Sequence, residues 1–360
     1  MCLLNSIYLF VYIYKENKRN TFIPSLSKIM KKTLSLYFFI LSATNIYSQS
    51  NYIEYHKEAR FIESYILDSS YVKAIQLYKN LFSKYDFIFA EDCFRAAQTA
   101  TLSNDSISSF LFLERAVHQG VTKESIVNDS ILIDLKRMKY WSIFEDNYDS
   151  IRDKYTANID WNLRQKINEI NDLDQKYRDK HELHPWNFLW RPLIWIKWKK
   201  ITKKIVEDKL IPLIKKHGFP NEKLIGLDEA SFHHKHKHDH LKSNYAFLIL
   251  IHYYSIPRTA DFNDLLLSQI KSGNIHPRQY ASLIDFQAKY GKGKYYKGLH
   301  YNEWHHSKNE NEIEQINKSR IKIGLELFEI HSKKLERGLK ACKEKKKGNH
   351  KHIRFWLFCG

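Results

Sequence analysis

Two stretches decide the fold class: Val72-Lys73-Ala74-Ile75-Gln76-Leu77-Tyr78 and Ile107-Ser108-Ser109-Phe110-Leu111-Phe112-Leu113. In both stretches the apolar residues recur at intervals of three or four, which is the spacing of one face of an α-helix. The same spacing, with few glycines, continues from Glu54 to about Tyr155. We therefore expect an all-α protein.

The two stretches also match each other at an offset of 35 residues. The turn signals Asp68-Ser69-Ser70 and Ser103-Asn104-Asp105-Ser106 recur with them, and both offer good helix caps. The offset is close to the repeat length of tetratricopeptide arrays, in which each helix pair buries its apolar face against the next. We predict one to two degenerate repeats within residues 50–155, closed by Trp141 and Phe144. The aligned pairs are Val72 with Ile107, Ile75 with Phe110, Tyr78 with Leu113, and Phe82 with Val117.

An export signal is expected near the start of the chain. Met30-Lys31-Lys32 is followed by the apolar run from Leu34 to Leu41 and then by Tyr47-Ser48-Gln49, the order found in secretory signal peptides. The apolar run is too short for a membrane-spanning helix, which needs about 20 residues. We expect residues 1–29 to be an untranslated extension and residues 30–49 to be a cleaved signal peptide. The protein would then be periplasmic or secreted.

The chain is strongly basic, with 58 Lys and Arg against 40 Asp and Glu. Residues 1–48 hold six of the basic residues and one of the acidic ones, so the expected mature chain keeps a net charge of +13. This charge favours anionic partners, which outside the cytosol are membrane surfaces, acidic polysaccharides or acidic proteins. We expect no nucleic acid partner. The alternative is that the charge serves only solubility.

The character of the sequence changes at about Trp161, and the following half resembles a known but uncharacterised family. The resemblance rests on an ordered set of motifs: Leu173-Asp174-Gln175-Lys176-Tyr177-Arg178, Ile211 to Pro220, Gly226, Leu248 to His252, Tyr280 to Asp285, and Arg320 to Leu325. The set is similar to the bacterial family named domain of unknown function 6624, often found behind tetratricopeptide-like helices in exported proteins. The resemblance implies a mainly helical domain over residues 161–335 and brings no known activity.

Two positions depart from the pattern of that family. The family usually has Arg after the aspartate at position 285, where this chain has Phe286. The family also has a Tyr-Gly-Thr-Gln-like loop, whereas this chain reads Tyr295-Tyr296-Lys297-Gly298. An activity that depends on this loop in relatives is therefore in doubt here.

A first candidate binding set is Asp174, Gln175 and Arg178, on a helix expected from Leu163 to about Lys180. Asp174 and Arg178 are four residues apart, so they share one helix face and can pair. The pair is either a solvated ion pair or an arginine held by the aspartate to receive an anionic ligand group.

The candidate catalytic residues are His252, Asp285 and Arg320. His252 ends the apolar run from Tyr245 to Ile251, and Asp285 is embedded among apolar residues. A buried carboxylate needs a partner, and Arg320 and His252 are the natural ones. Such a cluster could be the acid/base machinery of a hydrolase-like enzyme, a ligand clamp, or a buried structural network.

The run from His233 to His240 is the most conspicuous local motif. His234, His236, His238 and His240 share a face in an extended chain, and in a helix they pair at four-residue spacing. The run could bind a divalent transition metal, and the sequence indicates no other cofactor. Three interpretations remain: an exposed loop with incidental metal affinity, a site for metal acquisition or sensing, and a catalytic metal site.

A basic, tryptophan-rich helix is predicted after Pro192. The stripe Ile194, Trp198, Ile201 and Ile205 faces one way, and Lys197, Lys200, Lys203 and Lys204 face the other. We favour packing of the stripe on the core over membrane-surface contact through Trp195, Trp198, Lys199 and Lys200, and nucleic acid binding least.

The sequence favours a binding or interaction module of the cell envelope. The alternatives are a hydrolase-like enzyme centred on His252 and Asp285, and a metal-binding protein that uses the histidine run. Residues 343–360 have no capped or periodic pattern, so we expect a disordered basic tail.

Overall fold

The chain is helical wherever the structure describes it. The structure is a computed structural model, and it describes residues 51–182, 191–227, 245–291, 301, 309–346 and 353. Over these residues it contains helices and connecting turns and no strand. The all-α prediction from apolar spacing is confirmed.

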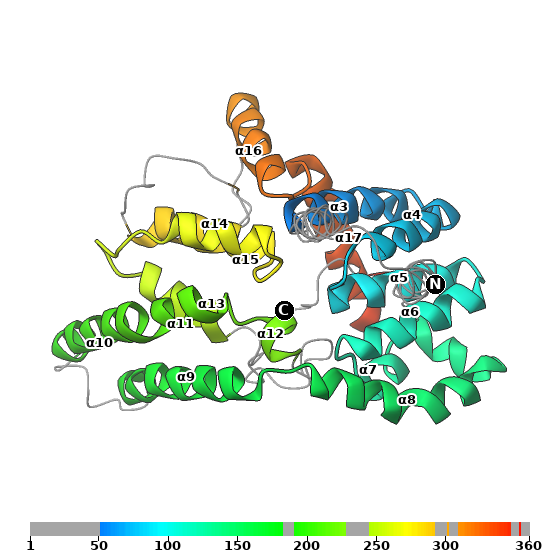
Figure 1. Cartoon of the computed structure of the whole chain (residues 1–360). Coiled ribbons are helices and arrows are strands. Elements are labelled where there is room, and N and C mark those ends of the chain that lie inside the picture. The colour runs from blue at the N-terminus through cyan, green and yellow to red at the C-terminus, as the bar shows by residue number, and fades with distance from the viewer. Residues whose placement is uncertain are drawn as a thin grey trace, which may run out of the picture. The chain divides into compact units, whose positions relative to one another are not determined.

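The first helices pack as successive pairs (Figure 1). Helix α3 packs on α4, α4 on α5, α5 on α6, and α6 on α8, so neighbours in the chain are neighbours in space. This arrangement is that of a helical repeat domain. The helices of this part are α3 (Tyr52–Leu67), α4 (Tyr71–Lys84), α5 (Ala90–Leu102), α6 (Ser106–His118), α7 (Lys123–Val127), the 3₁₀ turn η2 (Leu132–Arg137) and α8 (Tyr140–Ala157).

The offset of 35 residues relates α4 to α6 in the structure as well. Val72 and Ile107, the first aligned pair, are both exposed, at 65% and 69%. The other three aligned pairs are all buried in one core. The turns before the two helices also match, because Ser69 and Asn104 both have a positive φ, 57° and 59°. The two helices therefore repeat in conformation and in the face that they bury.

Helix α8 closes the first hydrophobic core. Trp141 and Phe144 are buried there, and the Phe144 ring lies 6.1 Å from that of Phe110 on α6. The prediction that Trp141 and Phe144 cover the last helix pair is confirmed.

The second part of the chain forms a second hydrophobic core. Its buried residues come mainly from α9, α11, α13, α14 and α15, with Ile205 at the end of α10. The elements are α9 (Trp161–Glu182), α10 (Arg191–Ile205), the π-helical turn η4 (Val206–Leu210), α11 (Ile211–His217), α12 (Glu222–Ile225), α13 (Tyr245–Tyr254), α14 (Asn263–Lys271), α15 (Pro277–Phe286), the π-helical turn η7 (Gln287–Gly291), α16 (Glu310–Lys322) and α17 (Phe328–Lys346).

Helices α10 and α11 follow each other without a break, because the π-helical turn η4 joins them. Helix α11 ends at His217, where Gly218 takes a positive φ of 92°. The π turn places Val206 and Leu210 together in the second core.

Helix α3 contributes to both cores. Tyr52 and Tyr55 belong to the first core and Ile53 to the second. The segment after α16 lies directly on α3 at Gly324, which has a φ of 89°. A Cβ added there would stand 2.8 Å from the carbonyl oxygen of Ile53. Only glycine fits both the conformation and the contact.

The C-terminal segment differs from the expected disordered tail at the positions that the structure describes. Helix α17 continues to Lys346, through residues that favour helix formation. Ile353 is fully buried and belongs to the first core. The remaining tail residues, like the expected signal peptide, lie outside the described residues.

The repeat relation gives a matched stability test. We expect Phe110→Ala to destabilise the fold by about 3–5 kcal/mol, because it leaves a cavity in the first core. Ile107→Ser, one turn away on the exposed side, should change stability by about 0.5 kcal/mol or less. Urea unfolding followed by circular dichroism measures both variants. Equal effects of the two substitutions would contradict the assigned helix face.

Candidate functional site

The candidate site lies where α9, α10 and α13 meet. Helix α13 packs on α9 and on α10. Its apolar run Tyr245–Ile251 buries Ile249 and Leu250 in the second core, which also holds Ile167 and Ile170 of α9. This packing brings the polar residue at the end of the run, His252, over the inner face of α9. Asp174 occupies that face.

Asp174 and His252 form a close pair. The Nδ1 atom of His252 lies 2.6 Å from Oδ2 of Asp174. The side chain of Asp174 is fully buried, and that of His252 keeps 14% exposure. The buried carboxylate fixes the ring orientation, and part of the imidazole side chain remains exposed.

Neighbouring side chains add hydrogen-bond donors. The Thr202 hydroxyl of α10 donates to Oδ1 of Asp174 at 3.4 Å, and the Gln175 amide donates to Oδ2 at 3.4 Å. The Trp198 ring lies edge-on to the His252 ring, with centroids 6.5 Å apart. Its indole Nε1 is buried without a hydrogen-bond partner among the described residues. The buried indole N–H is therefore an unpaired donor beside the pair among the described residues.

The pair has the chemistry of an acid/base centre. When the carboxylate accepts a hydrogen bond from Nδ1–H, Nε2 is left unprotonated and can take a proton from a water or hydroxyl group. The carboxylate also stabilises the imidazolium that forms. This tautomer is the one that a carboxylate at 2.6 Å favours.

The structure combines two residue sets that the sequence treated separately. Asp174, predicted as part of a binding set, is the partner of His252, predicted as catalytic. Gln175 lies beside the pair, whereas the side chain of Arg178 lies outside the described residues.

Asp285 and Arg320 meet at a different backbone segment. Asp285 accepts a hydrogen bond from the backbone N–H of Tyr301 at 3.0 Å. The guanidinium of Arg320 donates to the carbonyl oxygen of the same residue at 2.7 Å. These two side chains therefore hold Tyr301 from both sides. Both contacts are with the backbone of one residue.

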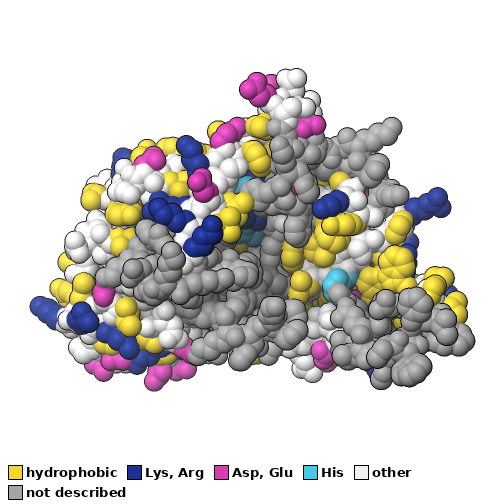
Figure 2. Space-filling view, turned by 180° about the vertical axis from the view of Figure 1, so that it is seen from behind, with side chains coloured by type: hydrophobic (Ala, Val, Ile, Leu, Met, Phe, Trp, Pro, Cys, Tyr) yellow, Lys and Arg dark blue, Asp and Glu magenta, His cyan; other side chains and the backbone are white. Residues whose placement is uncertain are grey.

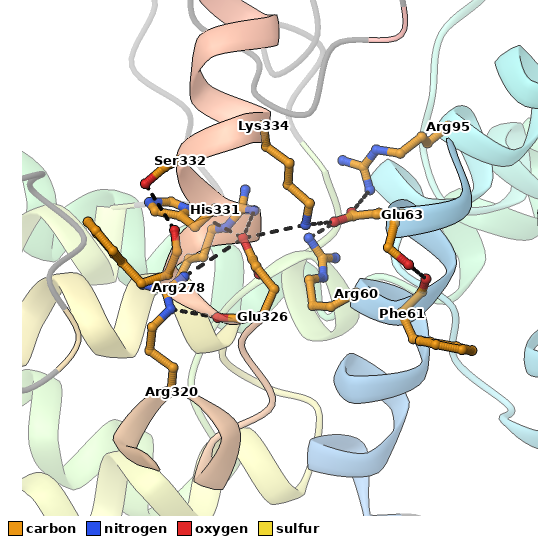
Figure 3. A network of polar contacts seen from close by, with 12 residues as sticks. Arg60, Phe61, Glu63, Arg95, Arg278, Arg320, Glu326, His331, Ser332 and Lys334 are labelled. Atoms are coloured by element: carbon orange, nitrogen blue, oxygen red, sulfur yellow. Dashed lines mark hydrogen bonds and ion pairs between the residues drawn. The ribbon is translucent and has the colours of Figure 1, made fainter. Parts of the chain in front are cut away.

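A second polar cluster is larger and deeply buried. It is an ionic network in which side chains of α3, α5, α15, α16 and α17 meet (Figure 3). All of its charged groups are buried or nearly so. Its members are Arg60, Glu63, Asp92, Arg95, Arg278, Arg320, Glu326, His331 and Lys334.

Glu63 is the acceptor at one end of the ionic network. Arg60, Arg95 and Lys334 converge on its carboxylate (Figure 3), at 2.8 Å for Arg60 and 2.5 Å for Arg95. Burial alone would raise the pKa of Glu63, but the positive charges of Arg60, Lys334 and Arg95 outweigh it and lower the pKa to about 2. Glu63 is therefore ionised at neutral pH.

Glu326 is the acceptor at the other end. Its Oε1 lies 3.0 Å from Arg278, 3.2 Å from His331 and 3.4 Å from Lys334. Burial opposes ionisation of Glu326, but Lys334 and Arg278 hold its pKa well below the usual range. Lys334 contacts both glutamates, so it joins the two ends. We interpret the ionic network as structural, because each Arg and Lys contacts at least one buried carboxylate.

Sequence reasoning identified only Arg320 among these residues. The available signal was weak: Arg60 and Glu63, and likewise Asp92 and Arg95, are charged pairs three residues apart on otherwise apolar helix faces. Both local pairs form, and their further partners come from distant parts of the chain. Lys334 is 271 residues from Glu63.

Glu222 at the start of α12 is a further perturbed carboxyl group. It accepts a hydrogen bond from the backbone N–H of Ala90, in the first turn of α5, where the helix has no side-chain cap of its own. Burial, with the nearby charges of Glu91 and Asp92, raises the pKa of Glu222 to about 8. The carboxyl group therefore keeps its proton at neutral pH and acts as an uncharged cap.

The predicted metal site cannot be located, because the run His233–His240 lies outside the described residues. Over the part of the chain that the structure does describe, no three His, Cys, Asp or Glu side chains are grouped so that they could hold a metal ion. In the same part, no helix combines the length and the hydropathy needed to cross a membrane.

The chain matches no family model, no curated protein and no solved structure.

The ionic network predicts a large difference between two glutamates of α3. Glu63→Gln should destabilise the fold by about 3–5 kcal/mol, because it leaves Lys334 and Arg95 buried without their carboxylate. Glu58 is the control, since it forms an exposed ion pair with Lys84 at 2.7 Å. Glu58→Gln should cost about 1 kcal/mol or less. Urea unfolding at pH 7 compares them, and similar midpoints would contradict the structural role of the ionic network.

The raised pKa of Glu222 predicts that the effect of Glu222→Gln on stability depends on pH. Its pKa is raised in the folded state, so its contribution to stability is present below about pH 4.5 and is lost as pH rises through about 8. Glu222→Gln removes this loss. Relative to wild type, the variant should gain about 1 kcal/mol or more between pH 5 and pH 8. Thermal unfolding of both proteins across this range measures the gain, and parallel pH profiles would refute the assignment.

Proposed function

We propose that this chain is an exported, hydrolase-like enzyme in which His252, held by Asp174, is the general base. The observation that carries the proposal is the 2.6 Å contact between a fully buried carboxylate and an imidazole that remains partly exposed. A purely structural histidine in an apolar setting gains nothing from an exposed edge. A base needs that edge, because its proton donor must reach Nε2.

The proposed step is activation of water. Nε2 of His252 takes a proton from a water molecule while the water oxygen forms a bond to an electrophilic carbonyl or phosphoryl centre. The bond to the leaving group then breaks, and the imidazolium returns the proton to the leaving oxygen.

The sequence alone favours a binding module of the envelope, with a hydrolase-like enzyme centred on His252 and Asp285 as an alternative. The proposal prefers the enzyme to the binding module. The contact between His252 and Asp174 supports the enzyme, with Asp174 in the role first given to Asp285. Membership in the uncharacterised family and export from the cytosol belong to the same proposal, and both rest on the sequence alone.

Hydrolysis of simple chromogenic substrates tests the proposal. We expect the wild-type chain to hydrolyse a nitrophenyl ester or a nitrophenyl phosphodiester, and His252→Ala to lower the rate by about 10²–10⁴-fold. Asp174→Asn should also lower the rate, because its amide N–H can donate to Nδ1 and favour the other tautomer, and because it lacks the negative charge that stabilises the imidazolium. His217→Ala is the control, since His217 is exposed at the end of α11.

Circular dichroism of each variant separates loss of activity from loss of folding. A folded His252→Ala variant with wild-type rates contradicts the proposal. So does a wild-type chain that hydrolyses neither substrate class faster than the folded His252→Ala variant.

A further inference from the structure

Helix α10 exposes a set of large apolar side chains that packing does not explain. Leu193, Trp195 and Ile196 are 59%, 50% and 62% exposed. Of the predicted stripe, Ile205 is buried and Ile201 packs against the second core, and Thr202 is buried beside them. The core therefore accounts for one face of α10 and leaves the other apolar side chains in solvent.

The exposed apolar side chains lie among lysines. Helix α10 contains five of them and no acidic residue: Lys197, Lys199, Lys200, Lys203 and Lys204. The Lys199 ammonium lies 3.4 Å from the centroid of the Trp195 ring. Lys203 donates to the carbonyl oxygens of Pro257 and Arg258, so it is held by the fold. On the side of the molecule that carries α9 to α14, hydrophobic side chains gather with lysines and arginines at the edge (Figure 2).

The combination points to one kind of partner. A second copy of the chain would bring two lysine-rich helices together, which charge repulsion opposes. Nucleic acid would attract the lysines but gives Leu193 and Ile196 no partner, because bases stack on aromatic rings. An anionic membrane surface provides partners for both kinds of side chain. The apolar side chains enter the membrane interface, and the lysines contact the lipid headgroups.

We propose that the first three turns of α10 dock on an anionic membrane surface. We define this docking face as Leu193, Ile196, Lys197 and Lys200, which share one side of the helix, together with Trp195, about 100° further round the helix from Ile196. All five side chains are exposed. The docking does not depend on the enzymatic proposal. If both hold, the Asp174–His252 pair lies behind α10, in contact with Trp198 and Thr202, and so close to the bound membrane.

Co-sedimentation with vesicles tests the docking face in the full chain. Wild type should bind vesicles of phosphatidylcholine and phosphatidylglycerol, and bind pure phosphatidylcholine vesicles weakly. The triple variant Leu193→Ser, Trp195→Ser, Ile196→Ser should bind the anionic vesicles at least about tenfold more weakly. The matched control replaces Phe61, Val72 and Ile107 by Ser, since these side chains are equally exposed at 56%, 65% and 69%.

Quenching of tryptophan fluorescence by brominated lipids reports membrane contact of residues after position 50, because residues 1–50 contain no tryptophan. Wild-type tryptophan fluorescence should be quenched on anionic vesicles, and Trp195→Phe should keep vesicle binding but lose part of the quenching.

Three outcomes would overturn the docking proposal: unchanged binding by the triple Ser variant, no preference of wild type for anionic vesicles, or a wild-type dimer that the triple variant converts to a monomer. His252→Ala should bind vesicles as wild type does, so failure of the enzymatic proposal and failure of this one are distinguishable.

Discussion

The burial of Glu63 is the constraint on which much of the structure depends. A carboxylate without solvent must be surrounded by donors, and it can stay ionised only when positive charges are held close to it. Arg60 comes from the same helix, Arg95 from the next helix pair, and Lys334 from near the C-terminus. Satisfying one side chain therefore fixes three helices against one another.

The same ionic network explains why the two hydrophobic cores stay together. Glu326 binds Arg278 of α15, which belongs to the second core, and shares Lys334 with Glu63 of α3. The neighbouring histidines add no charge: burial and the charge of Arg60 lower the pKa of His56, and burial together with His56 lowers that of His276. Their rings lie 4.8 Å apart between α3 and α15. Apolar packing forms each core, whereas the charged groups join the helices that border both.

The candidate site depends on ordinary helix packing rather than on the ionic network. The buried face of α13 determines its position on α9. His252 comes directly after the apolar run Tyr245–Ile251 of this helix. Helix α10 then covers the Asp174–His252 pair with Trp198 and Thr202 while turning its lysines outward. One amphipathic helix thus forms a wall of the site and an exposed apolar and basic surface.

The sequence by itself determined the local features of this protein. Apolar spacing gave the all-α fold, the 35-residue relation between α4 and α6, the cap formed by Trp141 and Phe144, and the buried face of α10, because each depends on residues within one or two turns of helix. It also singled out Asp174 and His252 one by one. Only the tertiary structure decided that these two are partners, and that Lys334 and Glu63 are. Side-chain pairs formed across many residues leave no periodic trace in a single sequence, since their distance depends on how the helices between them pack.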